Sequence, residues 1–179
     1  MHVNHVAVLT HTLEAVTSRL PDFCTPLEIE EQPAEGTREQ YVNIAGEGAP
    51  MLLLMQPVAQ GPYMRAMKKR GPGLHHIGGT TGSISALLPR IAEHRLLVHP
   101  ISLHTIARKE VWLCRPGVPF LVEITEDDSS DSVMCRLELP AKWPVPPFVR
   151  GFFSNLEVHN AADDRICFRV GDRTVSFSM

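Results

Sequence analysis

The sequence lacks the features that define several large classes of protein. Its 179 residues carry 17 basic and 20 acidic side chains, which gives a net charge of −3. Nucleic-acid phosphates require a basic surface, so we expect no nucleic-acid partner. The longest candidate for a membrane span is PMLLLM, residues 50–55. It suits a strand and falls far short of the roughly 18 apolar residues that a span needs, so we expect no membrane partner either.

Cysteine is also scarce, and the cysteines present are scattered. They form no Cys-x-x-Cys pair and stand at Cys24, Cys114, Cys135 and Cys167. The first residues lack the basic stretch and the following apolar run of a signal peptide. We therefore expect reduced thiols in a cytoplasmic protein, with neither a disulfide framework nor a zinc knuckle.

What the sequence does contain is typical of a globular protein. Hydrophobic residues make up 44% of the chain and charged residues 21%, close to the average for soluble domains. A chain of this length suits one domain, or one domain with an extension. We therefore expect a packed core.

A weak internal repeat relates two parts of the chain. The segment NHVAVLTHTLEAVTSRL, residues 4–20, matches HHIGGTTGSISALLPRI, residues 75–91, with His5 on His76 and apolar residues in register after it. Both segments predict a strand, a short loop and an amphipathic helix. Pro89 falls inside the second helix, so we expect that helix to be kinked or to begin late.

The segments that follow each copy also correspond. Three strand-like runs follow each predicted helix, at residues 26–31, 38–46 and 50–57 and at residues 95–103, 109–117 and 118–126. Each half therefore predicts the order strand, helix, strand, strand, strand. Residues 60–71, between the halves, predict a short helix with a cationic end.

Two adjacent histidines stand in the segment GPGLHHIGG, residues 71–79. Pro72 and the glycines indicate a chain reversal, and LHHIGG then predicts a short extended segment. Successive side chains on a strand point to opposite faces, so His75 and His76 are not expected to enter one cavity. The simplest interpretation is one exposed histidine and one hydrogen-bonded core histidine.

Three motifs together resemble the vicinal oxygen chelate superfamily, which includes glyoxalase I, extradiol dioxygenases and methylmalonyl-CoA epimerase. The motifs are HVAV at 5–8, KKRGPGLHHIG at 68–78 and FLVEI at 120–124. The second motif is most similar to the epimerase branch. The resemblance implies an α+β fold in which paired βαβββ modules form a curved mixed-sheet cleft around a divalent metal ion.

The resemblance covers roughly residues 3–126 and implies a glyoxalase-like domain over residues 1–127. Its two modules are expected at about 3–57 and 73–126. Residues 128–179 form a β-rich extension that the resemblance does not cover.

The extension has three parts by composition. DDSSDS at 127–132 is typical of a linker, and AKWPVPPF at 141–148 is too rich in proline for regular structure. Residues 164–179 predict a β-hairpin around a VGDRT turn. We expect the extension to pack on the preceding domain or to cover a sheet edge, because some 50 residues make a marginal core alone.

The resemblance implies a metal-ligand set of His5, His76 and Glu123. The repeat independently places the two histidines at equivalent positions, so internal twofold symmetry would bring them together. Glu123 lies in the apolar run PFLVEI, where an unpaired carboxylate is costly to bury. Its partner is either a metal ion or an arginine such as Arg38 or Arg108.

Two histidines and a carboxylate leave coordination positions open, as substrate-activating metal sites require. The resemblance implies a divalent ion, which is zinc, cobalt, nickel, manganese or iron, without selecting among them. With this ligand set, His75 is expected to point away from the cleft.

The chain departs from the superfamily where a fourth ligand, Glu or Gln, commonly stands. Leu53 falls at that position, and Gln56 has the opposite strand parity and reaches the site only if a bulge intervenes. Either the site works with three protein ligands and water, or it has decayed into a binding pocket. We predict the first, with an open cavity that Leu53 and Met55 do not close.

The resemblance implies an epimerase, isomerase or lyase that acts next to a carbonyl through a metal-stabilised enolate. The substrate is then a small molecule, and in the epimerase branch an acyl-CoA thioester. Proton removal needs a base within hydrogen-bond reach. The candidates are Glu123 and Glu39, which lies near a strand glutamate that some epimerases use; an exposed strand residue is the alternative interpretation of Glu39.

Two other functions stay open from the sequence. A set of two histidines and one glutamate without a fourth ligand also resembles an Fe(II) extradiol-type dioxygenase. Leu53 and the unusual extension also fit a non-catalytic module that binds a small molecule. Because two-module chains of this superfamily commonly associate, the resemblance further implies a homodimer.

Overall fold

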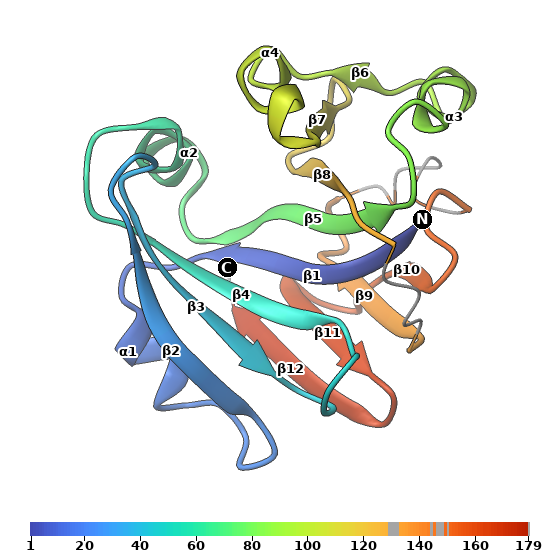
Figure 1. Ribbon diagram of the computed structural model, residues 1–179. Coiled ribbons are helices and arrows are strands. Elements are labelled where there is room, and N and C mark those ends of the chain that lie inside the picture. Colours follow the sequence, from blue (N-terminus) through green and yellow to red (C-terminus); the bar gives the residue numbers. More distant parts are fainter. Residues whose placement is uncertain (129–132, 144, 146–148, 150, 179) are drawn as a thin grey trace.

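The computed structural model describes residues 1–128, 133–143, 145, 149 and 151–178. Two β-sheets make up most of it, one of eight strands and one of four, with short helices between the strands (Figure 1). Within these residues no helix is long and apolar enough to cross a membrane.

The larger sheet is built from two copies of one element order. The first copy comprises β1 (His2–Leu9), α1 (Leu13–Thr17), β2 (Thr25–Gln32), β3 (Thr37–Asn43) and β4 (Met51–Pro57). The second comprises β5 (Gly73–Thr81), α3 (Leu87–Glu93), β6 (Leu97–Val98), β7 (Glu110–Cys114) and β8 (Leu121–Glu126). Between the copies lies α2 (Pro62–Arg70), which begins with a proline and ends on three basic residues.

The order of strands in this sheet is symmetric about its centre. It is β2-β3-β4-β1-β5-β8-β7-β6. The strands β1 and β5 pair antiparallel in the middle, and each pairs in parallel with the last strand of its own copy. An internal twofold axis therefore relates the halves, and the expected α+β fold of paired βαβββ modules in a curved mixed sheet is confirmed.

Alternation along β1 explains how the sheet is buried on both faces. Val6 and Val8 belong to the main hydrophobic core, whereas Ala7 and Leu9 belong to a separate buried cluster that α2 covers with Tyr63. A strand with a period of two can serve both faces in this way. The second cluster lies on the face that also carries His5, so α2 packs beside the candidate site.

The second copy departs from the expectation for residues 95–103. Only Leu97–Val98 form a strand, and the chain then continues as α4 (Ser102–Thr105) and the 3-10 turn η1 (Ile106–Arg108). Pro100 has no N–H to donate to a ladder. Ser102 instead fixes the segment, because its hydroxyl donates to the Trp112 carbonyl and accepts from the Trp112 N–H. The second predicted helix begins late, at Leu87, as Pro89 indicated.

The C-terminal part forms the four-stranded sheet. Its strands are β9 (Cys135–Leu139), β10 (Leu156–Asn160), β11 (Arg165–Val170) and β12 (Arg173–Ser178), in the order β10-β9-β11-β12. The expected hairpin corresponds to β11 and β12, which turn at Gly171 with a φ of 62°. Residues 129–132 of the expected linker, and 144 and 146–148 of the proline-rich segment, lie outside the described residues.

The smaller sheet packs against the larger one and shares its core. Val6 of β1, Leu137 of β9 and Phe168 of β11 belong to one buried hydrophobic cluster. Asn155 adds a polar link, because its side chain accepts a hydrogen bond from Val3 N–H at 2.7 Å and donates one to the Val3 carbonyl at 3.1 Å. The extension is therefore hydrogen-bonded to β1, the strand that carries His5.

Candidate metal centre

Three side chains from three strands converge at the centre of the larger sheet. Nε2 of His5 lies 2.9 Å from Nε2 of His76, and an oxygen of Glu123 lies 3.5 Å from the first nitrogen and 3.1 Å from the second. The histidines are buried and the Glu123 side chain is 16% exposed. The structure thus brings together the three residues that the resemblance implied as ligands, while their role as ligands stays a prediction.

Two β-bulges in the pairing of β1 with β5 set the directions of the His5 and His76 side chains. In the β1–β5 ladder Val3 pairs with Gly79 and His5 with Gly78, so Asn4 is an extra residue on its strand. Farther along, Ala7 pairs with His76 and Val8 with Leu74, so His75 is extra on the other strand. An extra residue breaks the alternation of side chains. One such residue immediately precedes each histidine of the centre.

The bulge at His75 corrects the expectation drawn from simple alternation. His75 is not the exposed member of the pair, because it is 5% exposed and His76 is 2% exposed. Its ring does not line the cavity of the centre; it contacts His76 from behind, with 2.9 Å between the two Nδ1 atoms. His75 thus points away from the centre, yet it is in contact with one of its members.

Each bulge residue meets the Nδ1 atom of the histidine that follows it. Asn4 Oδ1 lies 2.8 Å from His5 Nδ1, and an amide oxygen is only an acceptor, so we assign the proton of His5 to Nδ1. Nε2 then directs its lone pair at the centre. The same orientation of His76 follows if its Nδ1 donates to His75. Such contacts behind a histidine ring fix metal-binding imidazoles in many proteins.

A glycine makes the close approach of the rings possible. Gly78 pairs with His5, and a Cβ atom at Gly78 would overlap the His5 imidazole. Two aromatic rings pack edge-on against the histidines. The ring centroids of Tyr41 and His5 are 5.9 Å apart, and those of Trp112 and His76 are 4.9 Å apart. The rings hold the histidines in place from both halves of the sheet.

The charge states of the centre suit a cation. Burial alone would raise the pKa of Glu123, but its close contacts with His5 and His76 outweigh that effect and hold the pKa well below its usual range. Burial lowers the pKa of His76, an effect that Glu123 only partly offsets. An ionised carboxylate and a neutral imidazole are the forms that bind metal ions.

The spacing of the donor atoms also fits an ion. The separations of 2.9, 3.1 and 3.5 Å fall within the roughly 2.8–3.6 Å between neighbouring ligands that bonds of about 2.0–2.2 Å imply at angles from about 90° to the tetrahedral angle. One donor atom from each residue lies within 4.8 Å of the other two. The residues present therefore fit a divalent ion.

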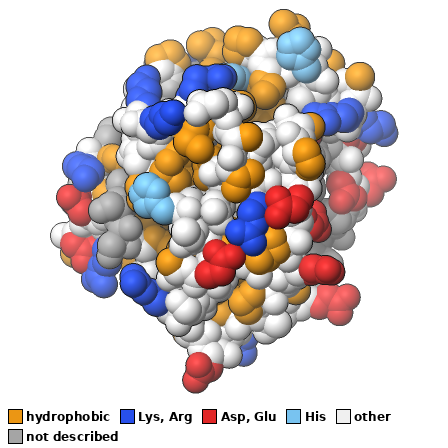
Figure 2. Space-filling view, turned by 90° about the vertical axis from the view of Figure 1, so that its left-hand side faces the viewer, with side chains coloured by type: hydrophobic (Ala, Val, Ile, Leu, Met, Phe, Trp, Pro, Cys, Tyr) orange, Lys and Arg blue, Asp and Glu red, His pale blue; other side chains and the backbone are white. Residues whose placement is uncertain are grey.

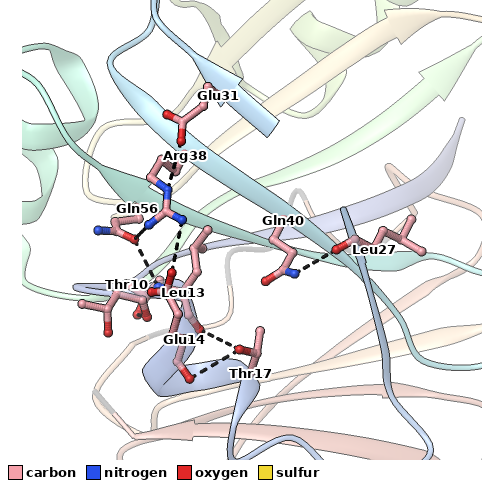
Figure 3. A network of polar contacts seen from close by, with 10 residues as sticks. Thr10, Leu13, Glu14, Thr17, Leu27, Glu31, Arg38, Gln40 and Gln56 are labelled. Carbon is pink, nitrogen blue, oxygen red and sulfur yellow. Dashed lines mark hydrogen bonds and ion pairs between the residues drawn. The ribbon is translucent and has the colours of Figure 1, made fainter. Parts of the chain in front are cut away.

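The alternative partners proposed for Glu123 are occupied elsewhere. Arg38 contacts Glu31, Glu14 and Gln56 (Figure 3), and Arg108 lies 3.9 Å from Glu110. Neither arginine pairs with Glu123.

The same network removes Gln56 from the candidate ligands. Its side-chain oxygen accepts from Arg38 at 3.2 Å and from the Leu13 N–H at 3.3 Å (Figure 3). The structure gives Gln56 a structural role at the start of α1.

Strand register identifies Leu53 as the counterpart of Glu123. Ala7, two residues after His5, pairs with Leu53; Gly78, two residues after His76, pairs with Glu123. The two positions are therefore equivalent under the internal symmetry. A cavity of about 200 Å³ lies over the centre with Leu53 and Met55 in its lining, so these side chains leave it open.

Glu39 lines this cavity from β3 rather than facing solvent. Its carboxylate accepts a hydrogen bond of 2.7 Å from the Thr37 hydroxyl, and burial raises its pKa despite that bond. A carboxyl group with a raised pKa beside a cavity is a candidate acid or base.

A second glutamate of the same kind escaped the sequence argument. Glu110 on β7 lines the same cavity, accepts a hydrogen bond of 2.6 Å from Trp112 Nε1, and has a pKa that burial raises. It stands 71 residues after Glu39, the separation of His5 and His76. The repeat offset was the signal that could have found it.

Comparison with known proteins shows similarity in structure but not in sequence family. No protein-family model matches the sequence, and no curated protein matches it significantly. Among solved structures, a hypothetical protein from Bacillus halodurans is similar with a TM-score of 0.54 and 21% identity, over 70% of this chain and 94% of that one.

Two methylmalonyl-CoA epimerases are also similar in structure. A variant of the Streptomyces coelicolor enzyme, in complex with 2-nitronate-propionyl-CoA, gives a TM-score of 0.52 at 18% identity, over 73% of this chain and 98% of that one. The Mycobacterium tuberculosis enzyme gives 0.50 at 18% identity, over 69% and 85%. At these identities the comparisons establish that this chain has the fold of the epimerases.

Proposed function

We propose that the protein is a divalent-metal-dependent epimerase, isomerase or lyase that acts next to a carbonyl group. The observation that carries the proposal is the meeting of His5, His76 and Glu123 below a cavity that two half-buried glutamates also line. A bound ion would supply Lewis acidity that stabilises an enolate. The chain itself would supply the ligands and the proton transfer.

In this proposal Glu39 and Glu110 move the proton. They come from β3 and β7, which are symmetry-related strands in opposite halves of the sheet. Glu39 as carboxylate would take the proton from the carbon next to the carbonyl, and Glu110 as carboxylic acid would return one to the other face. Burial raises the pKa of both carboxyl groups, which makes the carboxylate of Glu39 a stronger base and favours retention of a proton by Glu110. We assign Glu123 to holding the ion, because its low pKa makes it a weak base.

The substrate class follows only from the neighbours in structure. Some of them are methylmalonyl-CoA epimerases, and one is bound to 2-nitronate-propionyl-CoA. We therefore propose an acyl-CoA thioester with an acidic α-hydrogen as the first substrate to test.

The test is proton exchange in deuterated buffer. Protein freed of metal with a chelator and then loaded with zinc, cobalt, nickel, manganese or iron is incubated with methylmalonyl-CoA, and deuterium at the α-carbon is measured by mass spectrometry. We expect exchange only after metal loading. Glu39→Gln should lose exchange of the epimer whose proton Glu39 removes, whereas Glu110→Gln should exchange that epimer without inverting the α-carbon. The exposed Glu30→Gln serves as the matched control and should exchange normally. No exchange with any of the five ions would contradict the proposal.

An Fe(II) extradiol-type dioxygenase is the second candidate. Leu53 at the symmetry position of Glu123 leaves two histidines and one carboxylate, the set that open Fe(II) sites use. Oxygen uptake by the iron-loaded protein with catechol would select this function. A purified protein that binds none of the ions would instead select the non-catalytic binding module.

A homodimer is also proposed, from the superfamily resemblance alone. Sedimentation equilibrium of the full chain would give a mass of about twice 19.9 kDa if it forms.

A further inference from the structure

A second and larger cavity adjoins the candidate metal centre. Its volume is about 570 Å³, and it lies between α2, the start of β5 and the segments before β7 and β8. It shares Tyr63 and Trp112 with the smaller cavity, so the two side chains form a common wall. A volume of this size is within the range of sites for small organic ligands.

The walls of this second cavity are mostly apolar. The side chains that form them include Ala66, Ile101, Val118, Pro119, Phe120 and Leu121. Such a lining accepts a hydrocarbon or aromatic body.

One rim of the cavity is cationic. Arg65, Lys69 and Arg70 lie along the face of α2 that borders it, and all three are exposed. In the described part of the chain none of the three makes an ion pair or a side-chain hydrogen bond. Figure 2 shows Lys and Arg side chains grouped toward the upper left beside hydrophobic surface, with acidic side chains lower on that face.

The charge of the two cavities is opposite. The cavity over the centre is lined by four acidic side chains, those of Glu35, Glu39, Glu110 and Glu123, whereas no acidic side chain lines the second cavity within the described residues. Three uncommitted cations on one rim attract an anion, and the acidic neighbour repels it.

We propose that the second cavity binds an organic anion with an apolar body, whose charged group lies against Arg65, Lys69 and Arg70. The site does not depend on metal binding at the neighbouring centre. A ligand or substrate long enough to pass Tyr63 and Trp112 would occupy both cavities.

The test uses the fluorescent probe 1-anilinonaphthalene-8-sulfonate, which joins an aromatic body to a sulfonate. We expect saturable binding, displacement by octanoate and much weaker displacement by 1-octanol, which has the same chain without the charge. The double variant Arg65→Glu with Lys69→Glu should weaken probe binding by about tenfold or more, and added salt should weaken binding to the unchanged protein.

Matched controls separate the site from general charge and from the metal centre. Lys68→Glu alters the same exposed helix outside the cavity lining and should change affinity by less than about twofold. Ile101→Asp places a negative charge in the apolar wall and should weaken binding as the double variant does. Glu123→Gln should lose metal and keep the probe.

Three results would overturn the proposal: equal weakening by Lys68→Glu and the double variant, equal displacement by octanoate and 1-octanol, or loss of probe binding in Glu123→Gln. Because the measurement involves no turnover, failure of the epimerase proposal leaves its outcome unaffected.

Discussion

The two halves of the eight-stranded sheet present the same positions to one cavity, and they differ at one decisive point. Three pairs of residues line this cavity from symmetry-related positions: His5 and His76, Glu39 and Glu110, and Tyr41 and Trp112. The fourth pair is Leu53 and Glu123, where one half has a hydrocarbon and the other a carboxylate.

The backbone and the aromatic rings of Tyr41 and Trp112 are related by the internal symmetry. The metal-ligand candidates are not related in this way, because Leu53 has no donor atom. The first half contributes one donor to the centre, and the second half contributes two. Leu53 keeps its side of the centre apolar while Glu123 provides the negative charge. His5, His76 and Glu123 would hold an ion there, and Leu53 would add no donor from the first half.

Removing a member of the centre should have the largest effect. His76→Ala deletes a central donor and should reduce metal affinity by more than the roughly 10–100-fold that loss of an outer partner costs. Isothermal titration with zinc and cobalt measures it. His104→Ala, at an exposed histidine outside the centre, is the control; unchanged affinity in His76→Ala would refute the ligand set.

Making the halves alike should have the next largest effect. Leu53→Glu adds the missing carboxylate, so we expect tighter metal binding by at least about tenfold, together with destabilisation of the metal-free protein by several kcal/mol as an unpaired charge is buried. Metal titration and thermal unfolding are measured together. Lower stability without tighter binding would indicate that the centre has decayed.

Altering the bulge residues should have a smaller effect. Asn4→Leu and His75→Leu each remove a contact behind a histidine ring, and each should weaken metal binding by about 10–100-fold. Asn4→Asp keeps an acceptor and should bind nearly normally. If both leucine variants bind as the unchanged protein does, the bulges do not orient the histidines.

The smallest effect concerns the pH dependence of stability. Burial raises the pKa of Glu110 above its unfolded value, so its favourable contribution is fully present below the unfolded pKa and is lost as the pH rises through the folded pKa. Glu110→Gln keeps an acceptor for Trp112 and should remove the loss of stability that Glu110 contributes as the pH rises above its unfolded pKa. Glu39→Gln should act in the same direction. Urea unfolding at several pH values measures both.

Much of the fold could be predicted from the sequence, because its signals are local. Apolar periodicity and the repeat of His5 and His76 predicted two copies of one element order, and the copies are present. The prediction of a full strand over residues 95–103 was wrong, because the hydroxyl of Ser102 forms hydrogen bonds with the backbone of Trp112. That competing contact comes from another strand and leaves no local signal.

Part of the candidate site could also be predicted, because its motifs are local in the sequence. His5, His76 and Glu123 lie together as the motifs implied, but the position of His75 depends on a bulge that alternation cannot reveal. Glu110 was missed because the residue-by-residue match of the repeat ended with its opening helix, and the later strands were matched only by their order. The cationic rim on α2 was visible as a basic run, whereas its apolar counterpart is assembled from segments distant in sequence.

The hydrogen bonds between Val3 and Asn155 have a consequence for the order in which the protein is completed during synthesis. The two residues are 152 positions apart, and a ribosome makes residue 3 long before residue 155. Contacts across such a separation form late and slow the search for the native state. Until Asn155 emerges, the bulge beside His5 lacks its outer support, and the apolar face that the smaller sheet covers is open to association with other chains. The strand β1 therefore leaves the ribosome before the other described strands, yet it is among the last of them to reach its final geometry. The cavity that His5 lines is completed at the same late stage.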